Sequence, residues 1–219
     1  TPSDNDYYEG NISHYANDSD HGGLITGNTI TDIFVDQKAT GERKIIWAGT
    51  NHGLNKIVIG GMNKRLHIIK IYSNPNSKNG MQGDFVSVIH QDKDANLWIV
   101  CINGFLNEII GHRFSNDRPI FKTVDINANG SFDTTESLQE DNKGYFWMGG
   151  LRLIRFNPHD LSIKYYEGEN GIQNNSFKIW SSCKISSGNL VFGGINGFSV
   201  FNPNKLKDNN VVPKIAFND

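Results

Sequence analysis

Four segments of the chain are similar to one another, and this internal repeat limits the possible folds more than any other feature of the sequence. The segments are Ile30–Ile57, Val86–Ile109, Glu136–Phe156 and Trp180–Phe201. Their aligned reference positions, spaced by 51, 49 and 44 residues, are Trp47, Trp98, Trp147 and Val191. A period of about 40 to 50 residues indicates an architecture assembled from repeated supersecondary units.

Each repeat contains a short apolar strand, a polar turn, a second strand that ends near glycine, another turn and a third strand. Alternating polarity and β-branched residues predict strands, and the turns DKDAN, DNKG and SSG predict antiparallel hairpins. A fourth strand is predicted after each of the first three hairpin pairs, over Leu66–Tyr72, Arg113–Val124 and Ser162–Glu167. We therefore predict an all-β fold, a β-propeller fragment of about four blades of four-stranded antiparallel sheets.

The residues at the aligned positions predict how neighbouring blades make contact. A β-sandwich, the alternative fold, gives no reason for an aromatic residue to recur at one place in successive hairpins. In a propeller, such a tryptophan wedges between neighbouring sheets, with its N–H hydrogen-bonded. We predict that Trp47, Trp98 and Trp147 are blade anchors and that Val191 takes their place in the last repeat.

Composition argues against several classes of protein. The chain has 219 residues, 37% of them hydrophobic, and a net charge of −2. These values disfavour disorder and a charged surface for nucleic acid or for direct membrane contact. No apolar run is long enough to span a membrane, and the start, TPSDND, predicts a piece of a longer protein. Cys101 and Cys183 have no metal-type spacing.

Two motifs carry a resemblance to a known family. HQDKDANLWIVCINGF and QEDNKGYFWMGG resemble the two-component regulator propeller repeat, and residues 168–219 resemble the last blade of such a propeller. The positions that match that last blade are Gly171, Asn174, Phe177, Gly188, Leu190, Phe192, Gly193, Gly194, Gly197, Phe201, Pro203 and Pro213. The resemblance covers the chain from about residue 20 to its end.

The resemblance implies the C-terminal part of the periplasmic sensor region of a hybrid two-component system of gut-bacterial type, or of a related one-component regulator. Such proteins place a histidine kinase in the cytoplasm and control polysaccharide-utilisation genes. The partners expected from the resemblance are an oligosaccharide ligand, the remaining propeller blades and Ig-like domain of the parent chain, and a second copy through self-association.

The repeats divide the chain into six parts. The predicted parts are an outer strand of a preceding or closing blade (1–18), four blades (19–73, 74–125, 126–168 and 169–206) and a connection to an Ig-like domain (207–219). Three departures from the family pattern are an insertion at QKATGERK, Leu153 in place of a turn glycine, and loss of Trp and Asp in the last repeat. Four repeats leave unpaired blade edges. Either Tyr7–Asn17 closes a four-bladed ring, or the open fragment packs against more chain or a second copy.

Polar residues five positions beyond the anchors are the candidate ligand contacts. In the family's topology, the second-to-third turns and the connections between blades lie on one face, and these turns contain His52, Asn103, Arg152 and Asn196. All four can hydrogen-bond a sugar hydroxyl, although Asn and His also suit tight turns. Trp180 is the candidate for stacking on a sugar ring, or it fills the gap at Val191. The glycines of HGGLITGN, GMQGD and GIQNN are expected to be structural.

The sequence gives no sign of catalysis, of a metal or of a cofactor. Asp92, Asp94, Glu140 and Asp141 occupy first hairpin turns, where Asp satisfies backbone N–H groups, whereas a glycosidase or lyase needs one unique acid and base. The Asp-rich turns lack the last glutamate of a calcium loop. We predict a non-enzymatic ligand sensor. A propeller-type polysaccharide lyase or other lyase, and a purely structural or dimerisation module, remain alternatives.

Overall fold

The repeats fold into fifteen strands within the residues that the computed structural model describes, which are 14–17, 24–36, 38–39, 43–60, 66–127, 133–166 and 176–206. Each sheet is an antiparallel meander whose strands follow the order of the sequence. The first sheet contains β1 (Ile30–Asp36), β2 (Lys44–Thr50), β3 (Gly53–Ile59) and β4 (Leu66–Ile71). The second contains β5 (Val86–Gln91), β6 (Leu97–Cys101), β7 (Phe105–Gly111) and β8 (Ile120–Asp125).

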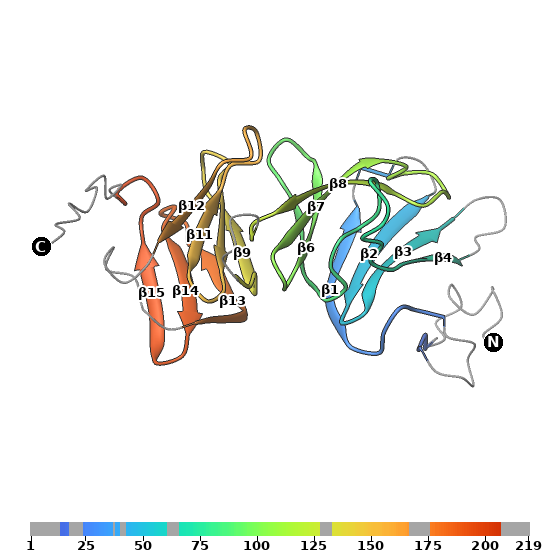
Figure 1. Cartoon of the computed structure of the whole chain (residues 1–219), viewed down its shortest axis with the longest axis horizontal. Coiled ribbons are helices and arrows are strands. Elements are labelled where there is room, and N and C mark those ends of the chain that lie inside the picture. Colours follow the sequence, from blue (N-terminus) through green and yellow to red (C-terminus); the bar gives the residue numbers. More distant parts are fainter. Residues whose placement is uncertain are drawn as a thin grey trace, which may run out of the picture.

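The third sheet contains β9 (Ser137–Glu140), β10 (Phe146–Gly149), β11 (Leu153–Phe156) and β12 (Ile163–Tyr166). The last sheet contains β13 (Phe177–Lys184), β14 (Leu190–Gly194) and β15 (Gly197–Phe201). The four sheets follow one another in an open row from β4 to β15 (Figure 1), and the first strands of successive sheets, β1, β5, β9 and β13, pack against one another. This is the four-bladed β-propeller arrangement that the sequence predicts. The predicted outer strand Tyr7–Asn17 lies outside the described residues except for 14–17, which form no strand.

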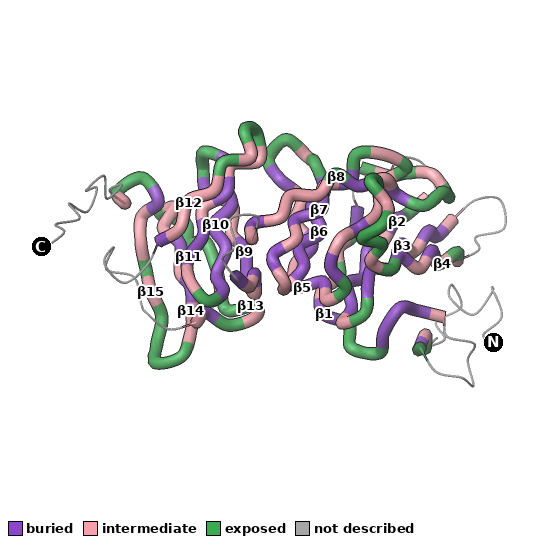
Figure 2. The backbone as a smooth tube through the Cα atoms, in the orientation of Figure 1, coloured by how far each residue is buried: buried purple, intermediate pink, exposed green. Residues whose placement is uncertain are grey.

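Three apolar cores fill the spaces between successive sheets. Figure 2 shows buried residues along the strands and exposed residues at the turns. The first core packs β2 and β3 against β5 and β6, around Trp47, Leu54, Ile89 and Ile99. The second core surrounds Trp98 and Phe146, and the third surrounds Trp147 and Phe192. Burial of this apolar area between sheets is the main term that holds the row together.

The three tryptophan anchors are fully buried, and each indole N–H donates a hydrogen bond to an aspartate of the first hairpin turn in its own sheet. The Nε1 to Oδ2 distances are 3.3 Å for Trp47–Asp36, 3.0 Å for Trp98–Asp92 and 2.9 Å for Trp147–Asp141. These aspartates therefore hold the anchors as well as their own turns, and Asp92 and Asp141 also accept backbone N–H groups.

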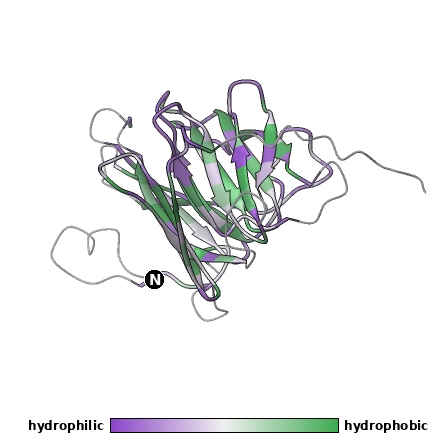
Figure 3. Cartoon of the chain, turned by 90° about the vertical axis from the view of Figure 1, so that its left-hand side faces the viewer, coloured by the Kyte–Doolittle hydropathy of each residue, from purple (hydrophilic) through white to green (hydrophobic). Residues whose placement is uncertain are grey.

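The last sheet has neither the tryptophan nor the aspartate, and three of its strands are described. Val191 is half-buried at the anchor position, whereas Phe198 and Val200 on the neighbouring strand are 70% and 51% exposed. In Figure 3, which views the chain from the side of this sheet, hydrophobic residues follow the strands and hydrophilic residues follow the turns. The face of the last sheet that points away from the third sheet is therefore apolar and exposed to solvent.

The prediction of a strand throughout Arg113–Val124 is wrong for its first half, because β8 begins at Ile120. Residues 112–119 instead form a turn whose carbonyl oxygens point at the buried Lys56 of the first sheet. Lys56 Nζ donates to the backbone oxygens of His112, Ser115 (2.7 Å) and Asp117 (3.3 Å). Carbonyls that bind an ammonium group in this way are not paired in a sheet.

Candidate functional site

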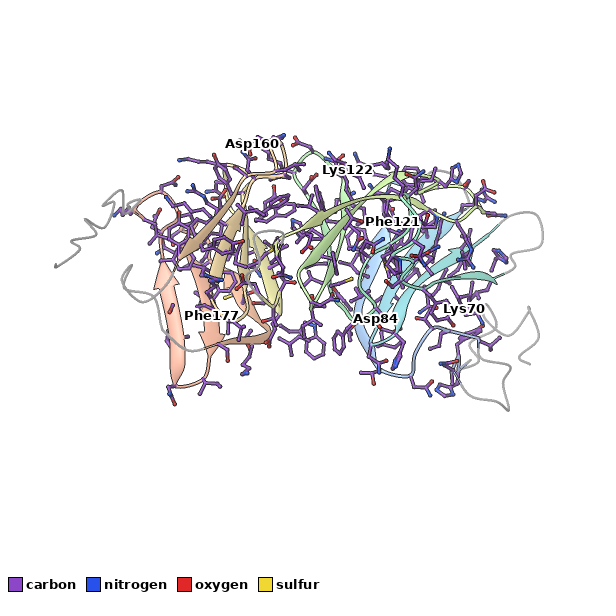
Figure 4. The ribbon with its side chains drawn as sticks, viewed as in Figure 1. Lys70, Asp84, Phe121, Lys122, Asp160 and Phe177 are labelled. Carbon is purple, nitrogen blue, oxygen red and sulfur yellow. The ribbon has the colours of Figure 1, made fainter. Side chains whose placement is uncertain are left out.

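The turns between second and third strands lie at one end of the sheets, together with the connections between sheets. His52, Asn103, Arg152 and Asn196 each lie in such a turn, as the sequence predicts. In the orientation of Figure 4 this end is the lower side of the molecule, where Asp84 is labelled, and Asp160 marks the opposite end. The connection GIQNN (171–175) lies outside the described residues.

A cleft of about 610 Å³ opens at this end of the first sheet. Its walls come from the segment before β1, the β2–β3 turn, the end of β4 and the connection that enters β5. The lining residues are Asn17, Thr26, Gly27, Asn28, Asn51, His52, Tyr72, Ser73 and Asp84. A second hollow of about 450 Å³ lies on the other side of Tyr72, against Pro119 and Phe121.

Asparagine side chains fix one wall of the cleft. Asn28 Oδ1 accepts the backbone N–H of Asn17 at 2.6 Å, and Asn28 Nδ2 donates to the backbone oxygen of Asn17 at 3.2 Å. Asn17 Nδ2 also donates to the backbone oxygen of Thr26 at 3.2 Å. Each of these amide groups already has a backbone partner, so the conformation of this wall does not depend on a ligand.

A buried network of hydrogen bonds holds Thr26, one of the residues that line the cleft. The hydroxyls of Thr26 and Thr50 lie 2.8 Å apart, and Asn55 Nδ2 donates to the Thr26 hydroxyl at 3.0 Å. Asn55 Oδ1 accepts the backbone N–H of Thr26 at 3.0 Å. In the second sheet, Asn107 Oδ1 accepts the backbone N–H of Gln82 at 2.9 Å, and Asn107 Nδ2 donates to the backbone oxygen of Gln82 at 3.0 Å. These two asparagines hold the connections to the sheets, a role that the sequence analysis missed.

Glycine is needed where a connection passes over a turn. A Cβ at Gly27 would lie 2.6 Å from Oδ1 of Asn51, and a Cβ at Gly83 would lie 2.6 Å from Oδ1 of Asn103. Gly83 also has a φ of +76°, which favours glycine. The expectation that these glycines are structural agrees with their close contacts.

The structure brings one of the five candidate ligand residues, His52, into the cleft. Arg152 instead forms an ion pair with the buried Asp133, with Nε 2.7 Å from Oδ1, and its guanidinium lies 4.5 Å from the centre of the Tyr165 ring. The backbone oxygen of Asn103 accepts a hydrogen bond from Asn127 at 2.9 Å. Asn196 is exposed at the β14–β15 turn with a φ of +69°.

Trp180 lies on β13, away from the cleft. Its side chain is 56% exposed, so the alternative that it fills the gap left by Val191 is wrong. Its φ is +59°, and its backbone N–H donates to the backbone oxygen of Glu136, the residue before β9. The indole is therefore presented at the surface of the last sheet.

Two cleft residues that sequence reasoning missed are Tyr72 and Asp84. Tyr72 follows the last residue of β4 and is 46% exposed, and Asp84 is exposed just before β5. Two features of the sequence could have identified them: Tyr72 ends a predicted strand, and Asp84 ends the connection GMQGD, which lies on the face expected for binding. Cys101 lies behind this connection, and burial, together with the charge of Asp84, raises the pKa of its thiol.

In the parts of the chain that the structure describes, no group of three or more His, Cys, Asp and Glu side chains is placed to bind a metal ion. The same parts contain no helix with the length and apolar character that crossing a membrane requires.

Comparisons with known proteins relate this geometry to two-component systems. No protein-family model matches the chain. The chain is 24% identical over 198 residues to histidine kinase P4 of Formosa agariphila, a match that covers 89% of this chain and 13% of that kinase. The alignment makes the chain a distant homologue of part of a histidine kinase.

Among solved structures, the chain is similar to the extracellular domain of a hybrid two-component system of B. thetaiotaomicron, with a TM-score of 0.63 and 19% identity over 88% of this chain and 24% of that one. It shares this propeller fold. The extracellular domain of a second such system from the same organism gives a TM-score of 0.52 at 22% identity, over 77% of this chain and 22% of that one. The propeller described here thus spans about a quarter of the extracellular domains that it resembles.

Proposed function

We propose that the chain is part of the periplasmic sensor region of a hybrid two-component regulator and that it binds an oligosaccharide to control polysaccharide-utilisation genes. The observation that carries the proposal is the cleft on the turn face of the first sheet, where amide and hydroxyl groups surround an exposed tyrosine. Polar groups that converge beside an aromatic ring are typical of small-molecule sites. The propeller fold and the distant relation to a histidine kinase support a sensor.

The hydrogen bonds of Asp92 and Asp141 argue against a lyase or glycosidase role for these two carboxylates. Asp92 and Asp141 accept hydrogen bonds from the indole of an anchor and from their own turn. A general acid or base must instead reach a proton of the substrate. We therefore propose a sensor without catalytic activity or cofactor of its own.

A ligand in the cleft contacts segments that lead into two sheets. Thr26–Asn28 and His52 belong to the first sheet, whereas Ser73 and Asp84 belong to the connection that enters the second. A ligand that bridges these segments favours the arrangement in which both contacts form. We propose that this bias passes along the row of sheets to the parent protein, by way of the Ig-like domain that the sequence predicts.

Further blades of the parent chain are the proposed partners of both end faces. Ile33 in β1 is 63% exposed, whereas Ile89, which has the same pairing position in β5, is buried beneath the first sheet. Phe198 in β15 is 70% exposed, whereas its counterpart Leu153 in β11 is fully buried. Exposed apolar faces of this kind mark contact surfaces. In the isolated chain, we propose that a second copy of the chain covers these exposed faces.

The test is the thermal midpoint of the protein in the presence of plant and host oligosaccharides, with mass spectrometry to detect products. A ligand at 100 times its dissociation constant stabilises the folded state by about 2.7 kcal/mol. We expect a shift with one glycan family and no product. His52→Ala should reduce the shift, and His159→Ala, at the opposite end of the sheets, should not. Product formation would support a lyase, and no shift with any glycan would support a structural module.

A further inference from the structure

The described lining of the cleft has an uneven distribution of charge. Among its nine residues, Asp84 is a carboxylate, His52 is an imidazole, and the others are uncharged polar residues, glycine and Tyr72. Lysine and arginine do not occur among these nine. Arg118 lines the second hollow, but it does so beside Asp117, so that hollow gains no net positive charge from the pair.

Asp84 lines this cleft, and its chain neighbours are packed against the protein interior. The preceding residue, Gly83, lies so close to the buried Cys101 that a Cβ there would be 2.7 Å from the cysteine Cβ. The following strand begins two residues later, at Val86, which is fully buried. The backbone on both sides of Asp84 is therefore held in place, and its exposed carboxylate can accept hydrogen bonds from hydroxyls and repels other anions.

Tyr72 supplies the apolar surface of the cleft. Its neighbour Ile71 is buried in the first core, which fixes the end of β4, while the tyrosine side chain is 46% exposed. The C–H face of a sugar ring can cover such a ring and expel water from both surfaces. A ligand therefore needs an apolar face, several hydroxyls and no negative charge.

We infer that this cleft selects uncharged sugar chains over chains that contain uronic acids or sulfate, with Tyr72 as the stacking surface and Asp84 as the acceptor for hydroxyls. The inference rests on the proposed function and adds the class of ligand. Because Asp84 is exposed to water, an anionic group about 4 Å from its carboxylate should weaken binding about fivefold.

The experiment compares two sets of oligosaccharides by isothermal titration, matched in length. One set comes from neutral polysaccharides, and the other contains uronic-acid and sulfated chains. We expect a ligand in the neutral set. Tyr72→Ala should weaken its binding at least tenfold, and Tyr72→Phe should retain it because the ring remains. Asp84→Asn should weaken the neutral ligand about tenfold, as expected for loss of a charged hydrogen-bond acceptor, and should remove the discrimination against anionic chains.

Matched controls separate the cleft from general effects. Phe114→Ala removes an exposed aromatic ring of the turn before β8, and Asp94→Asn removes an exposed carboxylate of a first hairpin turn. Both should bind like the wild type. Tighter binding of an anionic chain, or neutral binding that is unchanged in Tyr72→Ala, would overturn the inference and leave the sensor function in place. No binding from either set would overturn both.

Discussion

The third and last sheets have the same turn but not the same anchor. In the third sheet Asp141 begins the first hairpin turn, its N–H donates to the backbone oxygen of Tyr145, and its carboxylate accepts the indole of Trp147. In the last sheet Ile185 takes that place, and its N–H donates to the backbone oxygen of Asn189 in the same way. Gly144 and Gly188 both have a positive φ. The turn therefore forms without aspartate, which indicates that the carboxylate is present mainly for the tryptophan.

The largest expected effect comes from removal of an anchor. Trp147→Ala should lower the free energy of unfolding by about 4 kcal/mol, because the fully buried indole fills the core between the third and last sheets. Val191→Ala, at the corresponding place of the last sheet, should lower it by less than about 1 kcal/mol. Urea unfolding followed by circular dichroism measures both. Equal losses would mean that the open face is as tightly packed as the interior.

The first sheet holds its aspartate in a different way, through the second sheet. Arg113 places Nε 2.6 Å and an Nη 3.0 Å from the two carboxylate oxygens of the buried Asp36. Arg113→Ala should lower the free energy of unfolding by about 3 kcal/mol because it leaves a buried carboxylate without its cationic partner. Arg118→Ala, in the same turn but exposed, should change the unfolding free energy by less than about 0.5 kcal/mol. A small effect of Arg113→Ala would show that the Trp47 indole and the backbone N–H of Lys38 suffice for Asp36.

The link between aspartate and indole can be measured directly. Asp141→Ala should lower the unfolding free energy by about 2 kcal/mol, since it leaves a buried N–H without an acceptor. The same substitution in a Trp147→Phe background should cost clearly less, because the N–H is already gone. Asp160→Ala, on an exposed turn, is the control. An equal cost in both backgrounds would assign the stabilisation to the turn and contradict the comparison made above.

The smallest expected effect on stability comes from Lys56, the residue paired with the anchor Trp47. Lys56 faces Trp47 in the first sheet, where Val200 faces Val191 in the last. Burial lowers the pKa of Lys56 to about 8. Between about pH 8 and the ordinary lysine value of 10.5, the unfolded chain binds more protons at this group, so its contribution to stability rises with pH. Lys56→Met should flatten this rise in thermal unfolding curves, and an unchanged slope in the variant would contradict it.

Much of the fold follows from local signals. The strands alternate in polarity, the turns contain glycine and asparagine, and Trp47, Trp98 and Trp147 recur at a fixed place, so the blades and their anchors could be predicted. The turn before β8 could not, because its conformation depends on Lys56, which lies more than fifty residues earlier in the sequence.

The candidate site was predictable only in part. Position within the repeat predicted the turn that contains His52, and this residue lines the cleft. The same rule selected Arg152, whose guanidinium binds the buried Asp133, because residue type in a turn does not reveal a partner nineteen residues away. Tyr72 and Asp84 lie at the ends of a strand and a connection, where the repeat pattern is weakest.

The contacts of Arg113 and Lys56 also affect the order in which the molecule opens. Both side chains cross from one sheet to the next, so the first and second sheets are expected to lose their amide protection together, as one cooperative unit. The last sheet has an open face and no tryptophan anchor, and its amides are expected to exchange with solvent first. In amide hydrogen exchange the two ends of this row of sheets should therefore behave as separate structural units.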